Sequence, residues 1–286
     1  MEEIKYDTLF IGFVSMVSFH NFVKSILLYC SGRDKSLSFL KIIFNISSFI
    51  CSITSLLFFM IINLSCEMYM RVNYVQMIFN YFMMQSLAAY ILILISKYEK
   101  NKSELTKKVD MWINIVLLVT RATFNVAYIF FEISYQNNHE KGIKEKGFYL
   151  MNLTIIIDIF IDAYVMVRFI QILQKSKRHY YYYYNYNNNN NKNYNYKIFN
   201  LIIYWNILTI LVSLFYHSII GLNIFNDFYT SKLFLLIYLT QISLSYLITI
   251  DTEFKFKKGT TNSTVDFYDV HCPNSHYIKC PNNYYN

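Results

Sequence analysis

Seven long apolar blocks, separated by short polar segments, dominate this chain of 286 residues. Each block is long enough for a helix that crosses a bilayer, which needs roughly 20 apolar residues. Hydrophobic residues make up 55% of the chain and charged residues only 15%, a balance that excludes an ordinary soluble domain. We therefore predict an all-α integral membrane protein, a bundle of seven transmembrane helices at about 8–30, 38–64, 72–96, 111–131, 148–172, 198–222 and 233–250.

The orientation of the bundle follows from its basic residues, because Lys and Arg concentrate in cytoplasmic connections. Of the 26 Lys and Arg residues, three, Lys24, Arg121 and Arg168, are counted inside predicted spans. One set of alternate connections holds six of the others, and the second set holds seventeen, Lys41 among them. We therefore expect the N-terminus outside, with residues 1–7 as a short extracellular tail, and residues 251–286 as a cytoplasmic tail.

The connection 174–197 has a composition of its own. It carries five basic residues, no acidic residue, and a run of tyrosine and asparagine at 180–191. Such a low-complexity segment predicts a disordered cytoplasmic loop. Two interpretations stay open, a spacer without function and a flexible loop that contacts anionic lipid or a partner.

Two acidic residues, Asp158 and Asp162, lie one helical turn apart inside the fifth block. Placing a carboxylate without a partner inside a membrane span costs a few kcal/mol. Arg121 lies near the middle of the fourth block. Arg121 and Asp158 are each ten residues from the outer end of their blocks, so both lie roughly 15 Å deep. Because the fourth and fifth helices are antiparallel neighbours, we predict that Arg121 pairs with Asp158.

The roles of the other charges in these two blocks follow from their depth. Asp162, one turn deeper, either shares the guanidinium or stays protonated. Arg168 lies near the inner end, where its side chain is expected to extend toward the cytoplasmic surface. The intramembrane charges form either a structural ion pair or a functional element, such as a ligand counter-ion, a proton site or a switch.

Polar residues also recur at helical spacing on one face of several blocks. In lipid, small and polar residues mark the faces on which helices meet, so packing between helices is one interpretation. The second is that these faces converge on a small polar pocket. Its predicted lining residues are Gln85, Asn125, Tyr128, Ser213, His217, Tyr238 and Gln241. The dense serines of the second block, at 47–55, indicate close packing.

An outer N-terminus, seven spans, basic inner connections and a long fifth connection resemble the architecture of seven-transmembrane G-protein-coupled receptors. The resemblance covers about residues 8–258 and rests on topology. Motifs of the rhodopsin-like class are absent. Residues 96–99 read Ser-Lys-Tyr-Glu in place of an acidic-Arg-Tyr triplet, and residues 245–248 read Ser-Tyr-Leu-Ile in place of Asn-Pro-x-x-Tyr.

The resemblance implies a receptor that binds a small ligand in the outer half of the bundle and signals through its basic cytoplasmic loops. Its expected partners are membrane lipid, a small-molecule ligand and a heterotrimeric G protein, with no nucleic acid. Two other classes stay open: a small transporter or channel that uses the intramembrane charges as an ion or proton site, and a non-signalling scaffold. The membrane is either the plasma membrane or an endomembrane.

Motifs of catalytic and metal sites are missing from the sequence. There is no Gly-rich phosphate loop, nucleophile elbow or His-Glu-x-x-His motif. Two Cys and two His lie at 271–280, but the paired Cys-x2-Cys spacing of zinc sites is missing. We therefore expect no enzymatic activity, no catalytic or metal site and no cofactor.

Overall fold

The computed structural model describes residues 2–30, 35–60, 66–98, 104–138, 141–184, 190–225 and 231–257, and every one of these ranges is an α-helix. The prediction of an all-helical chain is confirmed for this part of the sequence. The helices are α1 (Glu2–Cys30), α2 (Lys35–Met60), α3 (Cys66–Tyr98), α4 (Glu104–Asn138), α5 (Lys141–Tyr184), α6 (Asn190–Phe225) and α7 (Ser231–Lys257).

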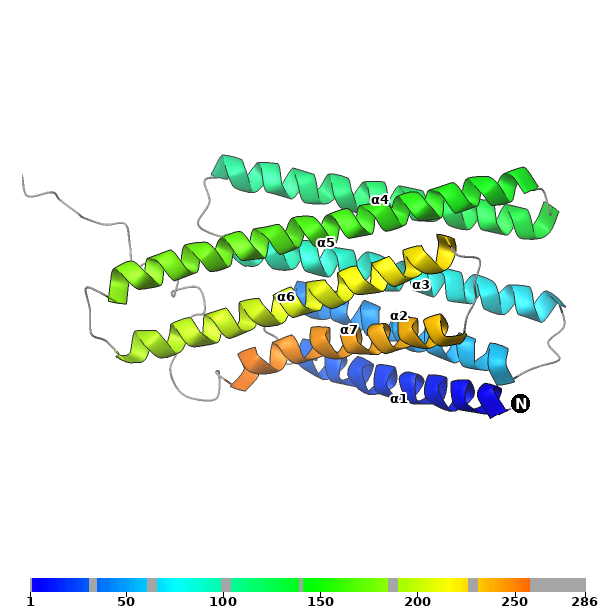
Figure 1. Ribbon diagram of the computed structural model, residues 1–286, viewed down its shortest axis with the longest axis horizontal. Coiled ribbons are helices and arrows are strands. Elements are labelled where there is room, and N and C mark those ends of the chain that lie inside the picture. Colours follow the sequence, from blue (N-terminus) through cyan, green and yellow to red (C-terminus); the bar gives the residue numbers. More distant parts are fainter. Residues whose placement is uncertain are drawn as a thin grey trace, which may run out of the picture.

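The seven helices form one elongated bundle (Figure 1). Each helix packs against the next one along the chain, and α1 packs against α7, so the neighbours form a closed ring. Two further contacts cross the ring, between α3 and α5 and between α2 and α7. Among the pairs of helices with substantial contact, α4 takes part only with α3 and α5, so it lies at the edge of the bundle.

Six of the seven helices are longer than the predicted spans, whereas α2, with 26 residues, is one residue shorter than its predicted span 38–64. α1 begins at Glu2, inside the segment expected as an outer tail, and α5 continues for 44 residues to Tyr184. Since α6 begins at Asn190, most of 174–197 is helical rather than disordered. That segment contains neither Gly nor Pro, the two strongest helix breakers, so nothing in it interrupts helical backbone. Residues 185–189 and the tail 258–286, with its Cys and His residues, lie outside the described residues.

Five helices among the described residues are long and apolar enough to cross a membrane, at Thr8–Cys30, Lys35–Phe58, Met68–Lys97, Glu104–Gln136 and Asn200–Gly221. α7 contributes a shorter apolar stretch, Leu235–Thr249. α5, which carries Asp158 and Asp162, is not among these five, so the prediction of seven spans is confirmed only in part for the described residues. The bundle is thus compatible with a multi-pass membrane protein, whereas the orientation with the N-terminus outside stays a prediction.

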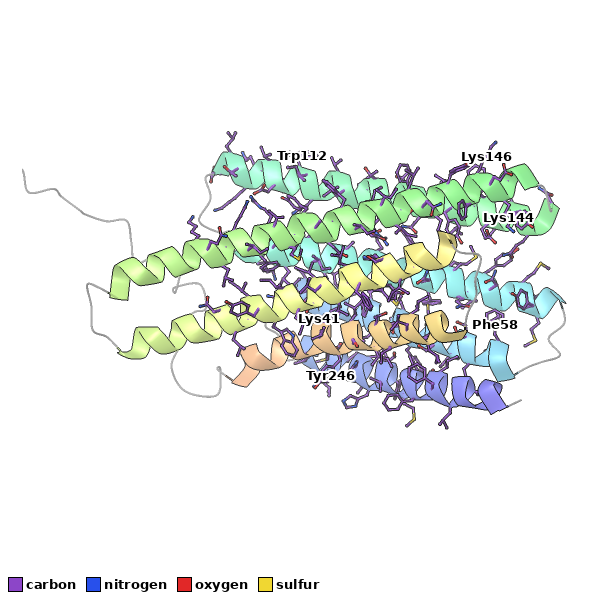
Figure 2. The ribbon with its side chains drawn as sticks, viewed as in Figure 1. Lys41, Phe58, Trp112, Lys144, Lys146 and Tyr246 are labelled. Carbon is purple, nitrogen blue, oxygen red and sulfur yellow. The ribbon has the colours of Figure 1, made fainter. Side chains whose placement is uncertain are left out.

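The distribution of side chains also fits apolar surroundings. Large apolar residues cover the outside of the bundle; Trp112 on α4 and Tyr246 on α7 are more than half exposed (Figure 2). Inside, almost as many polar as apolar side chains are buried. Such an arrangement would be costly in water, but in a bilayer lipid covers the outer residues and polar contacts join the helices.

Lys41 lies inside the bundle and not in a connection, where the charge count places it. Its side chain is 1% exposed, and its Nζ lies 5.2 Å from the centre of the Tyr90 ring on α3 (Figure 2). A desolvated cation near an aromatic ring is attracted by the electrons of that ring. The inner set of basic residues therefore loses one member, which leaves the direction of the asymmetry unchanged.

Serine residues on α2 allow α1, α2 and α7 to approach closely. Ser48 and Ser52 are completely buried, and the Ser48 hydroxyl lies 3.1 Å from that of Ser18 on α1. The amide of Gln241 on α7 donates to the same Ser48 oxygen at 2.8 Å. The small residues of the second block therefore lie at a junction of three helices.

We predict that Ser48→Leu destabilises the bundle by about 1–3 kcal/mol, because the larger side chain overpacks this junction and removes two hydrogen bonds. Thermal unfolding of the purified protein in one detergent measures the effect. Ser243→Leu is the matched control, since the Ser243 hydroxyl on α7 is exposed and bonds only within its own helix turn, to the Leu239 carbonyl. Equal losses for the two variants would contradict close packing at Ser48.

Candidate functional site: a buried charge cluster

Arg121 lies at the midpoint of α4, seventeen residues from Glu104 and seventeen from Asn138. At about 1.5 Å per residue, each end of the helix is roughly 25 Å away. The Arg121 side chain is 1% exposed and the Asp158 side chain 3%. Arg121 donates from Nε to Asp158 Oδ1 and, at 3.0 Å, from Nη2 to Oδ2. The structure therefore brings together the two charges whose depths match.

Gln85 on α3 completes the surroundings of the guanidinium. Arg121 Nη1 donates to Gln85 Oε1 at 2.7 Å, and Gln85 Nε2 donates to the carbonyl oxygen of Leu118 on α4 at 3.2 Å. The Arg121 side chain thus reaches oxygen atoms on two other helices. Fixed acceptors of this kind hold a planar guanidinium in one orientation.

Asp162 lies against α6. Its Oδ2 is 2.7 Å from Nδ1 of His217, and the Ser213 hydroxyl lies 3.1 and 3.0 Å from its two carboxylate oxygens. Asp162 is 1% exposed, Ser213 is completely buried and His217 is 4% exposed. Asp162 therefore shares α6 groups and not the Arg121 guanidinium, which differs from one of the two predicted alternatives.

His217 joins the two halves of the site. Its second ring nitrogen, Nε2, lies 3.7 Å from Asp158 Oδ2, so the ring is placed between the two carboxylates of α5. The side chains form one continuous set across four helices, which we call the buried charge cluster: Gln85, Arg121, Asp158, Asp162, Ser213 and His217.

The remaining predicted pocket residues lie elsewhere. Tyr238 on α7 donates to the Ser55 hydroxyl on α2, and Gln241 bonds Ser48, so both belong to the contact of α7 with α2. Asn125 is half-buried one turn from Arg121 and donates to the Arg121 carbonyl at 3.1 Å. Tyr128, also half-buried, is the next residue outward on that face of α4.

A second polar network, without charged groups, joins α1, α2 and α7. Asn21 donates to the Ser245 hydroxyl at 2.8 Å, and Ser245 donates to Asn45 Oδ1 at 2.7 Å. The Asn45 amide donates in turn to Ser25 at 2.7 Å and to Thr249 at 3.1 Å. We call this set the neutral network. It lies on the side of the bundle away from α4.

A second ion pair also links α4 with α5. Arg168 Nη2 donates to Asp110 Oδ2 at 3.1 Å, and the two side chains are 20% and 18% exposed. The expectation from the sequence is that the Arg168 side chain extends toward the cytoplasmic surface. Asp110 forms an ion pair with Arg168 because the antiparallel packing of the two helices brings the beginning of α4 to the level of Arg168 on α5.

His217 is a partner of Asp162 that depth in the membrane does not predict when only Lys and Arg are considered as partners. The available signal was spacing: Ser213 and His217 are four residues apart on α6, as Asp158 and Asp162 are on α5. Such pairs lie on one face of each helix and meet when the two helices pack. Within the described residues, His, Cys, Asp and Glu side chains form no group of three or more suited to hold a metal ion.

Comparison with models of known protein families, with curated proteins and with solved structures finds no match for this chain. Its function is therefore to be inferred from the geometry of the buried charge cluster and its surroundings.

We predict that Arg121→Gln and Asp158→Asn each destabilise the protein by about 3–5 kcal/mol, because each leaves a buried charge without its partner. The double variant should lose less than the sum of the two single losses. The free energy of unfolding in mixed micelles measures all three.

Arg168→Gln is the matched control, an Arg from the other ion pair between α4 and α5. Since that pair is partly exposed, its loss should cost only about 0–1 kcal/mol. The assignment of the buried pair fails if Arg121→Gln is no more harmful than Arg168→Gln.

Proposed function

We propose that this chain is a multi-pass membrane receptor in which a small ligand binds in the outer half of the bundle and acts on the basic cytoplasmic connections. The observation that carries the proposal is the buried charge cluster, which joins α3, α4, α5 and α6 through side chains near the middle of these helices. Five long apolar helices support a membrane location.

A receptor needs an element with two discrete arrangements that a ligand can favour unequally. Charged hydrogen bonds in apolar surroundings have this property, because they are strong when made and costly when left unmade. The cluster links helices that lie next to one another, so a change in one contact alters how the adjoining helices pack. We assign the two-state role to the Arg121–Asp158 contact.

The outer half of the bundle offers groups to a ligand close to this contact. Tyr128 on α4 is seven residues outward of Arg121, and Asn152 on α5 is six residues outward of Asp158, so both lie about 10 Å above the pair. Among the described residues, Asn152 Oδ1 is buried without a hydrogen-bond partner. A ligand with an N–H or O–H group would satisfy this oxygen.

Basal signalling tests the receptor proposal without knowledge of the ligand. In membranes of cells that express equal amounts of each variant with heterotrimeric G proteins, Asp158→Asn should change ligand-independent nucleotide exchange several-fold. Arg168→Gln, outside the cluster, should leave it at the wild-type level. The receptor proposal fails if exchange on every G protein is the same for wild type, Asp158→Asn and membranes without the protein.

The second candidate is a small transporter that carries a proton or an ion. The contact of Asp162 with His217 favours a transporter, because carboxylate and imidazole side chains inside a membrane commonly bind and release protons in pumps and transporters. Purified protein in proteoliposomes should then carry a proton or ion flux that Asp162→Asn abolishes. A scaffold would show neither this flux nor nucleotide exchange.

A further inference from the structure

The His217 ring lies between two carboxylates, and each of its nitrogens faces one of them. Nδ1 is 2.7 Å from Asp162 Oδ2, and Nε2 is 3.7 Å from Asp158 Oδ2. The side chain is buried on α6, and both acids come from one face of α5. This position determines which protonation state of the ring suits the site.

A neutral imidazole carries one N–H group and one nitrogen lone pair. If Nδ1–H donates to Asp162, the Nε2 lone pair is directed toward a carboxylate oxygen of Asp158, which is a repulsive contact. The doubly protonated ring has an N–H group on each side and meets both carboxylates favourably. The placement of the ring therefore suits the charged form.

The charge balance of the cluster leads to the same form. Arg121 is always protonated, so with both acids ionised and His217 neutral the cluster keeps one excess negative charge. That charge would be buried, since Asp158, Asp162 and His217 are each at most 4% exposed, and an uncompensated buried charge is strongly unfavourable. A single additional proton makes two cations against two anions.

The other groups around the pair do not alter this balance. α3 presents the neutral Gln85, α4 presents Arg121, and α6 itself adds the Ser213 hydroxyl. Tyr216 lies next to His217 on α6, α7 carries the buried Tyr238, whose hydroxyl donates to Ser55, and α2 carries the buried Cys51, whose thiol donates to the Gln76 carbonyl. None of these contributes an acid or a base that would take the proton in place of His217 or Asp162.

We propose that the Asp162–His217 pair is a binding site for a single proton, that the proton neutralises the buried charge cluster, and that its release weakens the contact of α5 with α6. The ligand of the site is the proton itself, which reaches a fully buried position more easily than a larger ion. The site is defined by the cluster geometry and exists whether the protein signals or transports.

Nuclear magnetic resonance of the ring nitrogens tests the proposal directly on the full chain in lipid nanodiscs. Histidine labelled with ¹⁵N gives signals from six His residues, and the His217 signal is the one missing in His217→Gln. At neutral pH both ring nitrogens of His217 should show the shifts of a doubly protonated ring, and raising the pH should convert them in a single step.

Two variants sharpen this test. In Asp162→Asn, the His217 ring should be neutral at a pH at which the wild-type ring is still doubly protonated, because one of its two anions is gone. His20→Gln is the control: His20 is exposed on α1, so the His217 signal should keep its wild-type pH dependence.

The pH dependence of thermal unfolding gives a second readout. The melting temperature of wild type and His20→Gln should fall as the proton leaves, whereas His217→Gln should lose that step. A His217 ring that is neutral at every pH at which the wild-type protein stays folded, together with an Asp162 carboxyl that shows no infrared band of the protonated form, would overturn the proposal. If His217→Gln does not fold, the melting temperature of the wild-type chain still decides the matter, because its independence of pH would overturn the proposal.

Discussion

The burial of the Arg121 charge at the midpoint of α4 is the constraint on which the arrangement of this bundle depends. A guanidinium in apolar surroundings needs acceptors on every side, and one helix cannot supply them. Asp158 supplies two oxygens from α5 and Gln85 one from α3. Asp158 also faces His217 on α6. The need of the Arg121 guanidinium for acceptors therefore determines how α3, α4, α5 and α6 lie next to one another.

The bundle has two unlike halves. The neutral network of amides and hydroxyls joins α1, α2 and α7, where protonation changes nothing at ordinary pH. The charge cluster joins α3, α4, α5 and α6, where a single proton changes the balance of charge. The apolar core consists of side chains from α3, α5 and α6, with some from α2 and α7. In the proposal of a proton site, only the half with the charge cluster therefore responds to a proton.

The number of helices among the described residues and the Arg121–Asp158 contact could be predicted from the sequence, because apolar length, charge and depth are properties of single segments. The antiparallel order of α4 and α5 then identified Asp158 as the partner of Arg121. The contact of Asp162 with His217 required the rotation of α6 about its axis, which a count of Lys and Arg does not give. The prediction for Lys41 was wrong for a related reason. A lysine near the end of a predicted span is counted with the adjoining connection, yet the Lys41 side chain lies inside the bundle, near the Tyr90 ring on α3.

The peripheral place of α4 has a consequence for synthesis. In a bilayer, an Arg at the centre of a helix opposes insertion by roughly 2.5–3.5 kcal/mol, and each Asp of the next helix adds a cost of the same kind. α4 makes its main contacts with α3 and α5 alone, so its neighbours are adjacent to it in the chain. α4 and α5 would thus enter the membrane most readily as a hairpin whose charges neutralise one another. A ribosome pause between the two helices would leave the charge of α4 unpaired and would oppose its insertion.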